Sequence, residues 1–282
     1  MKISNLPYGL LFQQTQRDGV APMLAWLEHC RACGFDGVEV ADMWLRNLQP
    51  EGVQAVRQRI HDLGLAVSCF NVWNCSTNAA PGEKRDQAVA AFAGHAATAR
   101  SLGAACISPD GGAWADFERY AMSRSQAVDR TVDTILRCVP PAQEAGLTIL
   151  LENHPGWLTR YADVLEEMLG RLPAPAVMLN LDTLHMYRER QTPEDFYARE
   201  AILSRVRYLH LKPARFEPDV ETGRWNQNIP FEQSQVDYGR MFRCLRAAGF
   251  DHWISYEAAS GLGLQGLGPG AAFIRKAWAE AT

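Results

Sequence analysis

Four side chains able to bind a metal ion each end a strand-like apolar run in this chain. The runs are LTILLE, AVMLNLD, VRYLH and HWISYE, and their last residues are Glu152, Asp182, His210 and Glu257. If these runs are parallel strands of one barrel, their C-terminal ends meet on one face and bring the four groups together. Three carboxylates in one place repel one another, and a bound cation offsets that repulsion. The pattern therefore predicts a site for one divalent metal ion.

The chemistry of this ligand set indicates which ions it suits. Three oxygen ligands and one nitrogen favour Mn²⁺, Mg²⁺ or Co²⁺ over the thiolate-rich sites typical of structural zinc. We expect Mn²⁺ first, with Mg²⁺, Co²⁺ or Zn²⁺ as alternatives. A single carboxylate at a strand end is usually a helix cap or a solvated group, so the prediction depends on all four residues occurring together.

Further histidines follow the same predicted strands. His185 lies three residues after Asp182 in LDTLHM, and we expect it to contact a substrate oxygen or to transfer a proton, with packing or capping as the alternative. His154, in ENHPG, would contact substrate, orient Glu152 or serve a structural role. The histidines at 29, 61 and 95 fall on predicted helices and are expected at the surface or an interface.

Strand-like runs alternate with helical segments along the whole chain. The predicted strands are 6–12, 37–40, 65–71, 105–108, a run ending at 152, 177–182, 206–211 and 253–257. The predicted helices are 22–33, 50–63, 84–102, one from 123 that bends or breaks at prolines 140 and 141, 161–169, 194–203 and 237–248. Parallel strands need crossover helices, so eight β/α units close most economically into a (β/α)8 TIM barrel. We expect one α/β domain over residues 1–282.

Composition and charge exclude several classes of protein. The net charge of −4 provides no general attraction for polyanions, so no nucleic-acid partner is expected. The first residues, MKISNLPYGLLFQQ, are not expected to form a signal peptide, and no run is long enough to cross a membrane. We expect a cytoplasmic protein and leave a homo-oligomer open. The seven cysteines imply no disulfides, and the CxxC of Cys30 and Cys33 is expected to be structural.

Two segments and three tryptophans that follow predicted strands are considered for substrate contact. Residues 214–235 fit no element and are expected to lie over the metal face, where Arg215, Arg224 and Trp225 would reach a substrate; a solvated loop is the alternative. The tryptophans at 73, 114 and 157 would stack on an uncharged sugar or cyclitol ring, or pack in the core. The glycine-rich segment 261–270 contains no Lys or Arg, so a flexible connection is expected there rather than a phosphate site.

The chain resembles the xylose isomerase-like barrel superfamily of sugar isomerases and epimerases. The matching pieces span nearly the whole chain and are GFDGVEV at 34–40, LLENHPG at 150–156, LDTLH at 181–185, HLK at 210–212 and VDYGRMFRCLRAAGFDHWISYE at 236–257. The resemblance implies that Glu152, Asp182, His210 and Glu257 hold one metal, which chelates adjacent oxygens of a hydroxy-ketone.

The same resemblance implies catalytic roles. Glu152 and Glu257 would exchange a proton with the substrate carbon through a metal-stabilised enediolate, and His185 would hold a substrate hydroxyl or carbonyl. The expected substrate-binding residues are His154, Lys212, Arg215 and Trp114. Lys212 would add positive charge, although strand alternation could turn it away from the barrel mouth.

These observations predict an isomerase or epimerase of a keto-sugar or related polyhydroxy ketone, with a carbohydrate or cyclitol as the small-molecule partner. The alternative is a dehydratase of the inosose or dehydroshikimate type, in which the enediolate expels a β-hydroxyl. A DNA repair nuclease of the endonuclease IV type is disfavoured because related enzymes carry further histidines after the third and fourth strands. This chain has only residues 71–74 and 108–111 there, without a histidine.

Overall fold

Eight strands of this computed structural model form a closed barrel in the order β1-β10-β7-β6-β5-β4-β3-β2. Their bounds are β1 Lys2–Leu6, β2 Gly37–Ala41, β3 Ala66–Val72, β4 Cys106–Pro109, β5 Thr148–Glu152, β6 Val177–Asp182, β7 Val206–Leu211 and β10 Trp253–Glu257. The structure describes residues 1–7, 10–73, 82–189, 191–218, 224–257 and 262–281. Helices separate the barrel strands along the chain, which confirms the predicted TIM barrel.

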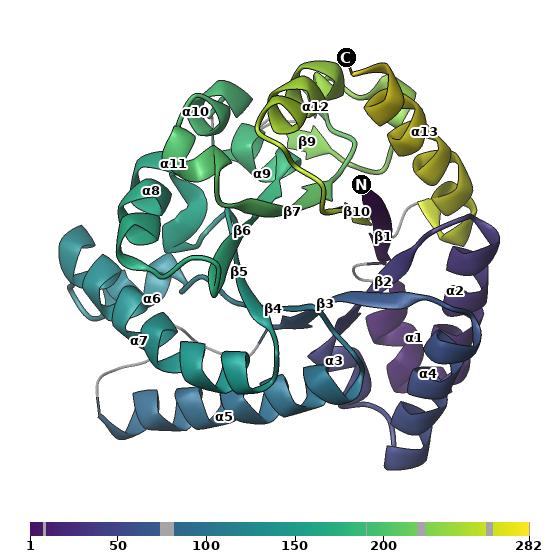
Figure 1. Ribbon diagram of the computed structural model, residues 1–282, viewed down its shortest axis with the longest axis horizontal. Coiled ribbons are helices and arrows are strands. Elements are labelled where there is room, and N and C mark those ends of the chain that lie inside the picture. Colours follow the sequence, from purple (N-terminus) through teal and green to yellow (C-terminus); the bar gives the residue numbers. More distant parts are fainter. Residues whose placement is uncertain (8–9, 74–81, 190, 219–223, 258–261, 282) are drawn as a thin grey trace. The chain divides into compact units, whose positions relative to one another are not determined.

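By its internal contacts the chain divides into two compact units, the first formed by Met1–Ser68 together with Leu209–Thr282. Its helices are α1 Leu10–Asp18, α2 Ala21–Ala32, α3 Asp42–Leu45, α4 Pro50–Asp62, α12 Tyr238–Ala247 and α13 Leu267–Glu280, with short turns η2 Phe231–Gln233 and η4 Leu264–Gly266. Strand β1 lies beside β10 in parallel register, from Lys2 opposite Trp253 to Leu6 opposite Glu257 (Figure 1). This pairing places Glu257 at the last rung of the ladder.

Buried polar side chains join the elements of the first unit. The amide of Asn5 donates to the carbonyl oxygen of Tyr256 at 2.7 Å, and the Trp26 indole donates to Asn5 Oδ1 at 2.7 Å. Strand β2 approaches its neighbours so closely that a Cβ on Gly37 would lie 2.7 Å from the Ala66 carbonyl oxygen. Glycine is therefore required at this position for strands β2 and β3 to approach as they do.

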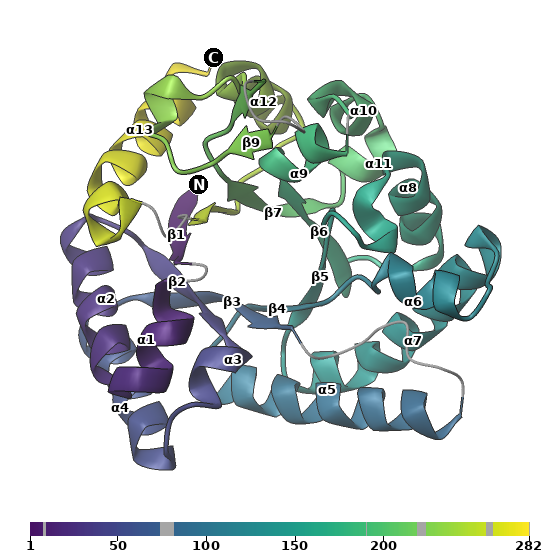
Figure 2. The same cartoon turned by 180° about the vertical axis from the view of Figure 1, so that it is seen from behind.

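The second unit comprises Cys69–Tyr208. Its helices are α5 Glu83–Ser101, α6 Trp114–Arg119, α7 Arg124–Glu144, α8 Ala162–Arg171, α9 Thr183–Arg188, α10 Pro193–Tyr197 and α11 Glu200–Leu203, with the turn η1 Leu158–Arg160. Helices α5 and α7 run beside each other (Figures 1 and 2). Strands β5 and β6 pair from Ile149 opposite Val177 to Glu152 opposite Asn180, so Glu152 and Asp182 end neighbouring strands.

The first predicted strand is wrong. The strand occupies Lys2–Leu6 rather than 6–12, and Leu10–Asp18 form helix α1 instead. Pro7 follows β1 directly, and a proline cannot donate to a sheet ladder. In α1 the buried residues Leu11 and Thr15 lie one turn apart, and the Thr15 hydroxyl donates to the Leu11 carbonyl at 2.9 Å. The short apolar run at 10–12 thus belongs to a helix, which a run of that length does not reveal.

Two predicted helices also differ from the structure. Helix α7 is a single helix through Pro140 and Pro141, although a break was one expectation there. Cys138, Val139 and Ala142 are buried around the two prolines, so packing outweighs the local cost of the lost hydrogen bonds. The predicted helix 194–203 is two short helices, α10 and α11.

Two segments expected to be irregular contain regular structure. Within 214–235, strands β8 Arg215–Glu217 and β9 Arg224–Asn226 pair as an antiparallel hairpin, followed by η2. Within 261–270, the turn η4 leads directly into α13, which begins at Leu267, so the described part of this segment is mostly helical rather than a flexible connection. No helix in the described part of the chain is long and apolar enough to cross a membrane.

Candidate metal centre

In the second unit, Glu152 and Asp182 are held at neighbouring strand ends by backbone-directed hydrogen bonds. The side chain of Asn153 both donates to the Asp182 carbonyl, at 3.1 Å, and accepts from the Asp182 N–H, at 2.6 Å. The Thr159 hydroxyl donates to the Glu152 carbonyl at 2.5 Å. In these bonds, side chains provide hydrogen-bond partners for the backbone N–H and C=O groups at the strand ends. They set the direction in which both carboxylates leave the barrel strands.

Asp182 also places His185. Its Oδ1 accepts the backbone N–H of His185 at 2.9 Å and caps α9, so one helical turn brings the imidazole back towards the strand end. His185 Nδ1 lies 3.6 Å from both Glu152 Oε1 and Asp182 Oδ1. This distance exceeds a hydrogen bond but places the buried imidazole beside both carboxylates. The predicted contact of His185 with a substrate oxygen, or its transfer of a proton, stays a prediction.

His154 supports His185 from the side. The ring centroids of the two histidines lie 4.6 Å apart in an edge-on arrangement, and the Trp157 ring lies 4.2 Å from His154. His154 Nδ1 is 2.7 Å from the Pro155 carbonyl oxygen, to which it donates. The described contacts of the His154 ring are with Pro155, Trp157 and His185, and the His154 backbone N–H donates to the Glu152 carbonyl oxygen at 3.0 Å. Its role towards a substrate stays a prediction.

In the first unit, His210 and Glu257 lie together at the ends of β7 and β10. His210 Nδ1 is 3.1 Å from Glu257 Oε2, and the Lys212 ammonium is 2.9 Å from Glu257 Oε1. Lys212 is only 4% exposed, so its charge is buried beside a carboxylate rather than turned to solvent. Strand alternation does not direct Lys212 away from Glu257, as the sequence alone allowed.

Glu39 on β2 is a functional candidate that was not predicted from the sequence. It is fully buried, and its two oxygens lie 3.1 and 3.2 Å from His210 Nε2. A carboxylate in this position accepts the Nε2–H, which leaves the Nδ1 lone pair on the side facing Glu257. The available signal was a glutamate inside the apolar run GVEV, because a buried carboxylate requires a polar partner.

Four of these residues form a group with metal-binding geometry: Glu152, Asp182, His210 and Glu257 each offer one ligand atom, and those atoms all lie within 4.8 Å of one another. Three members are buried and Glu257 is at the limit of burial. Water cannot separate three buried carboxylates effectively, so this donor set fits a divalent cation. The same residues are the ligands predicted from the sequence; their role as ligands is a proposal taken up below.

The other residues predicted to contact substrate either make their polar contacts away from this group or have side chains outside the described part of the structure. Arg215, on β8, is partly exposed and pairs with Glu217 at 3.8 Å and Gln233 at 3.3 Å, so its described polar contacts lie within the hairpin segment. Arg224 pairs with the same Glu217 at 3.2 Å. The backbone of Trp114 begins α6, but its side chain lies outside the described part of the structure. Cys30 and Cys33 are free thiols, and burial raises the pKa of both.

Comparison with known proteins assigns the class. The family described as xylose isomerase-like TIM barrel matches residues 27–277, nearly the whole chain. This chain therefore belongs to the xylose isomerase-like TIM barrel family. Solved structures agree: a D-psicose 3-epimerase from Clostridium cellulolyticum H10, determined with D-tagatose, is similar with a TM-score of 0.76 over 100% of this chain and 99% of that one. At 14% sequence identity, that likeness shows the shared fold.

Two curated relatives are similar in sequence over part of the chain. An inosose dehydratase of Geobacillus thermodenitrificans is 22% identical over 154 residues, which cover 50% of each chain. A 3-dehydroshikimate dehydratase of Bacillus anthracis is 30% identical over 121 residues, which cover 39% of this chain and 41% of the relative. The chain thus spans half or less of the length of the curated relatives it matches. Both sequence relatives have dehydratase names, whereas the similar solved structure that shares the fold is an epimerase.

Proposed function

We propose that this protein is a divalent-metal-dependent enzyme that transfers a proton at the carbon next to a carbonyl group, in a keto-sugar or related polyhydroxy ketone. The observation that carries this proposal is the group of buried ligands in which two glutamates, Glu152 and Glu257, end different strands. We assign the metal to Glu152, Asp182, His210 and Glu257, with Mn²⁺ as the expected ion. When bound, such an ion polarises a carbonyl and acidifies the neighbouring C–H.

The two glutamates are the proposed base and acid. Their neighbours differ, since His185 lies beside Glu152 and Lys212 contacts Glu257. An ammonium next to Glu257 stabilises negative charge there, which suits a base that starts ionised. An imidazole next to Glu152 supplies a group that can carry the proton onward. Return of the proton to the same carbon from the opposite face gives an epimer. Delivery of the proton to the former carbonyl carbon, while the hydroxyl proton moves to the former carbonyl oxygen, gives an isomer. This isomerase or epimerase reaction is the first candidate.

A dehydratase is the second candidate, favoured by the two relatives of known reaction. Both have dehydratase names, one for inosose and one for 3-dehydroshikimate. In this reaction the base removes the proton and a hydroxyl on the next carbon leaves as water, with His185 as the proposed proton donor to the departing oxygen. The carboxylates and histidine required are the same, so a carbohydrate or cyclitol substrate fits both candidates.

One screen separates the two reactions. Keto-sugars, inososes and dehydroshikimate are incubated with metal-loaded protein in deuterated water, and products are examined by mass spectrometry and proton NMR. With an epimerase or isomerase, the product contains one deuterium and has lost no water. With a dehydratase, the product is lighter than the substrate by one water. If neither change occurs with any of the three substrate classes, at a metal concentration that saturates the protein, the result contradicts the proposed function.

Glu39 provides a test of the metal site that does not depend on turnover. Changing Glu39→Gln removes the charge that holds the Nε2–H of His210 and is expected to weaken metal binding by about 10- to 100-fold. Titration calorimetry with Mn²⁺ measures this affinity directly. Glu28→Gln is the matched control, because Glu28 is an exposed glutamate paired with Arg59 at 2.6 Å. Equal affinity in the Glu39 variant and the control contradicts a positioning role for Glu39.

A further inference from the structure

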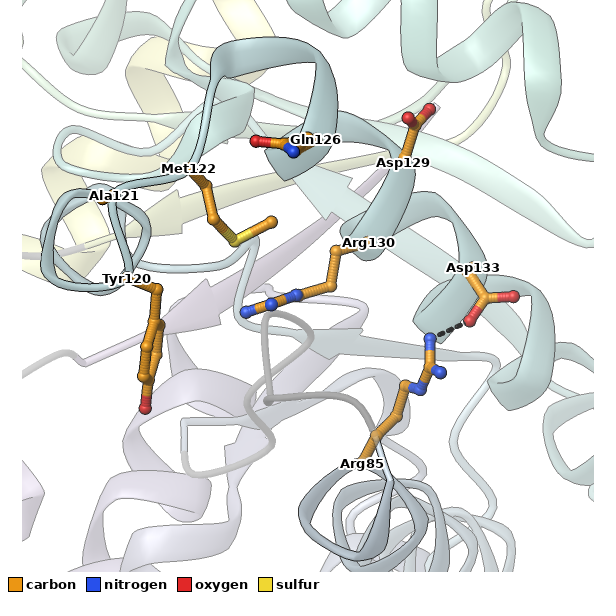
Figure 3. Close-up of a pocket in the computed structure, with 8 residues that line it drawn as sticks. All are labelled: Arg85, Tyr120, Ala121, Met122, Gln126, Asp129, Arg130 and Asp133. Atoms are coloured by element: carbon orange, nitrogen blue, oxygen red, sulfur yellow. Dashed lines mark hydrogen bonds and ion pairs between the residues drawn. The ribbon is translucent and has the colours of Figure 1, made fainter.

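A cavity of about 470 Å³ opens on the second unit between α5, α7 and the turn that joins α6 to α7, and none of its lining residues belongs to the candidate metal centre (Figure 3). Helix α7 contributes one face of it with residues a turn apart, and the turn between α6 and α7 contributes another. The lining residues are Arg85, Tyr120, Ala121, Met122, Gln126, Asp129, Arg130 and Asp133. The volume suits a small organic molecule.

The turn between α6 and α7 is held in a costly conformation that places two of these side chains. Ala121 has a φ of +49°, a left-handed conformation usually taken by glycine. The N–H of Met122 donates to the Phe117 carbonyl at 3.1 Å and that of Ala121 to Glu118 at 2.9 Å, which is the glycine-type helix ending made with an alanine. Tyr120 and Met122 flank this residue and form the apolar wall of the cavity.

Arg130 is the polar centre of the cavity. Its guanidinium carbon lies 5.6 Å from the centroid of the Tyr120 ring, and Figure 3 shows the side chain extending between Tyr120 and Arg85. Its Nη1 is buried and has no hydrogen-bond partner among the residues that the structure describes; the same holds for Arg85 Nε. A buried guanidinium N–H without an acceptor is unfavourable, and an incoming acceptor removes that cost.

The charges of the lining determine which acceptor fits. Asp133 forms an ion pair with Arg85, and Asp129 pairs with Arg171 of α8 at 2.8 Å. Both carboxylates of the cavity therefore already have a cationic partner. Arg130 adds one positive charge that no carboxylate of the described residues matches. A monoanion neutralises this charge, whereas a dianion such as phosphate brings a second negative charge next to Asp129 and Asp133. A planar guanidinium binds a carboxylate through two parallel hydrogen bonds.

We propose that this cavity binds a small organic monocarboxylate, with its carboxylate on Arg130 and its apolar portion against Tyr120 and Met122. Gln126, also in the lining, offers an amide to a polar substituent on the ligand. The site is independent of the proposed reaction, because its residues come from α5, α7 and the turn between α6 and α7 rather than from the barrel strand ends.

Benzoate is the probe for this site, and the methyl signal of Met122 in protein with labelled methionines is the readout. Saturable shifts of that signal are expected with wild-type protein. Binding is expected to weaken by at least about tenfold in Arg130→Gln and with the neutral isostere benzamide. Arg130→Lys keeps the charge but loses the planar guanidinium. We expect it to bind benzoate more weakly than the wild type and more tightly than Arg130→Gln. Inorganic phosphate is expected to shift the signal less than benzoate does.

Arg137→Gln is the matched control, because Arg137 lies on the same helix and pairs with exposed Asp86. It is expected to bind benzoate as the wild type does, and unchanged thermal unfolding of each variant shows that α7 is intact. Equal shifts in wild type and Arg130→Gln, equal binding of benzamide and benzoate, or tighter binding of phosphate would overturn the proposal.

Discussion

Replacing Glu257 or Glu152 by glutamine is expected to reduce exchange of the substrate C–H with solvent deuterium by about 10³-fold or more. Removing a general acid or base costs about 10²- to 10⁴-fold in rate, and both residues also belong to the proposed ligand set, which moves the loss to the upper part of that range. Glutamine has nearly the same shape as glutamate but cannot accept a proton at neutral pH. Proton NMR in deuterated water measures the exchange rate for each variant.

Metal content must be measured in the same samples, because a lost ligand and a lost base reduce activity in different ways. A variant that keeps one equivalent of metal and loses exchange identifies the glutamate as a proton-transfer group. Glu51→Gln is the control: Glu51 is exposed in the first turn of α4 and should leave exchange unchanged. Retained exchange in both the Glu257 and the Glu152 variants would remove these residues as acid and base.

Removing divalent metal is expected to abolish activity and to lower the melting temperature. Three buried carboxylates within 4.8 Å of their neighbours repel one another without a cation, so the folded state loses stability when the ion leaves. At a metal concentration of about 100 times Kd, binding contributes about 2.7 kcal/mol, which corresponds to a shift of roughly 5 °C in a chain of this size. Calorimetry before and after treatment with a chelator measures this shift.

Restoring the ion separates a specific site from a general salt effect. One equivalent of Mn²⁺ per chain should recover both activity and melting temperature, and Asp182→Asn should bind the ion more weakly because a ligand charge is lost. The comparison of Mn²⁺, Mg²⁺, Co²⁺ and Zn²⁺ at equal concentrations identifies the preferred ion. Full activity in protein shown by elemental analysis to contain no divalent metal contradicts the metal-dependent mechanism.

Much of the fold follows from local sequence. The strands ending at Asp182, Leu211 and Glu257 begin and end where their apolar runs predict, because the length of a buried run and its flanking residues are local properties. Local signals are weaker where a short run fits two structures. Leu10 and Leu11 belong to a helix rather than a strand, and α7 continues through Pro140 and Pro141, because burial in the folded protein outweighs those local preferences.

The candidate site divides in the same way. The sequence by itself placed Glu152, Asp182, His210 and Glu257 at strand ends, since the C-terminal ends of parallel barrel strands share one face. Only the tertiary structure paired Glu39 with His210, residues separated by 171 positions, and joined Arg130 to the turn at Ala121. Such contacts depend on side-chain direction and on register between distant elements, and no spacing along the chain specifies either.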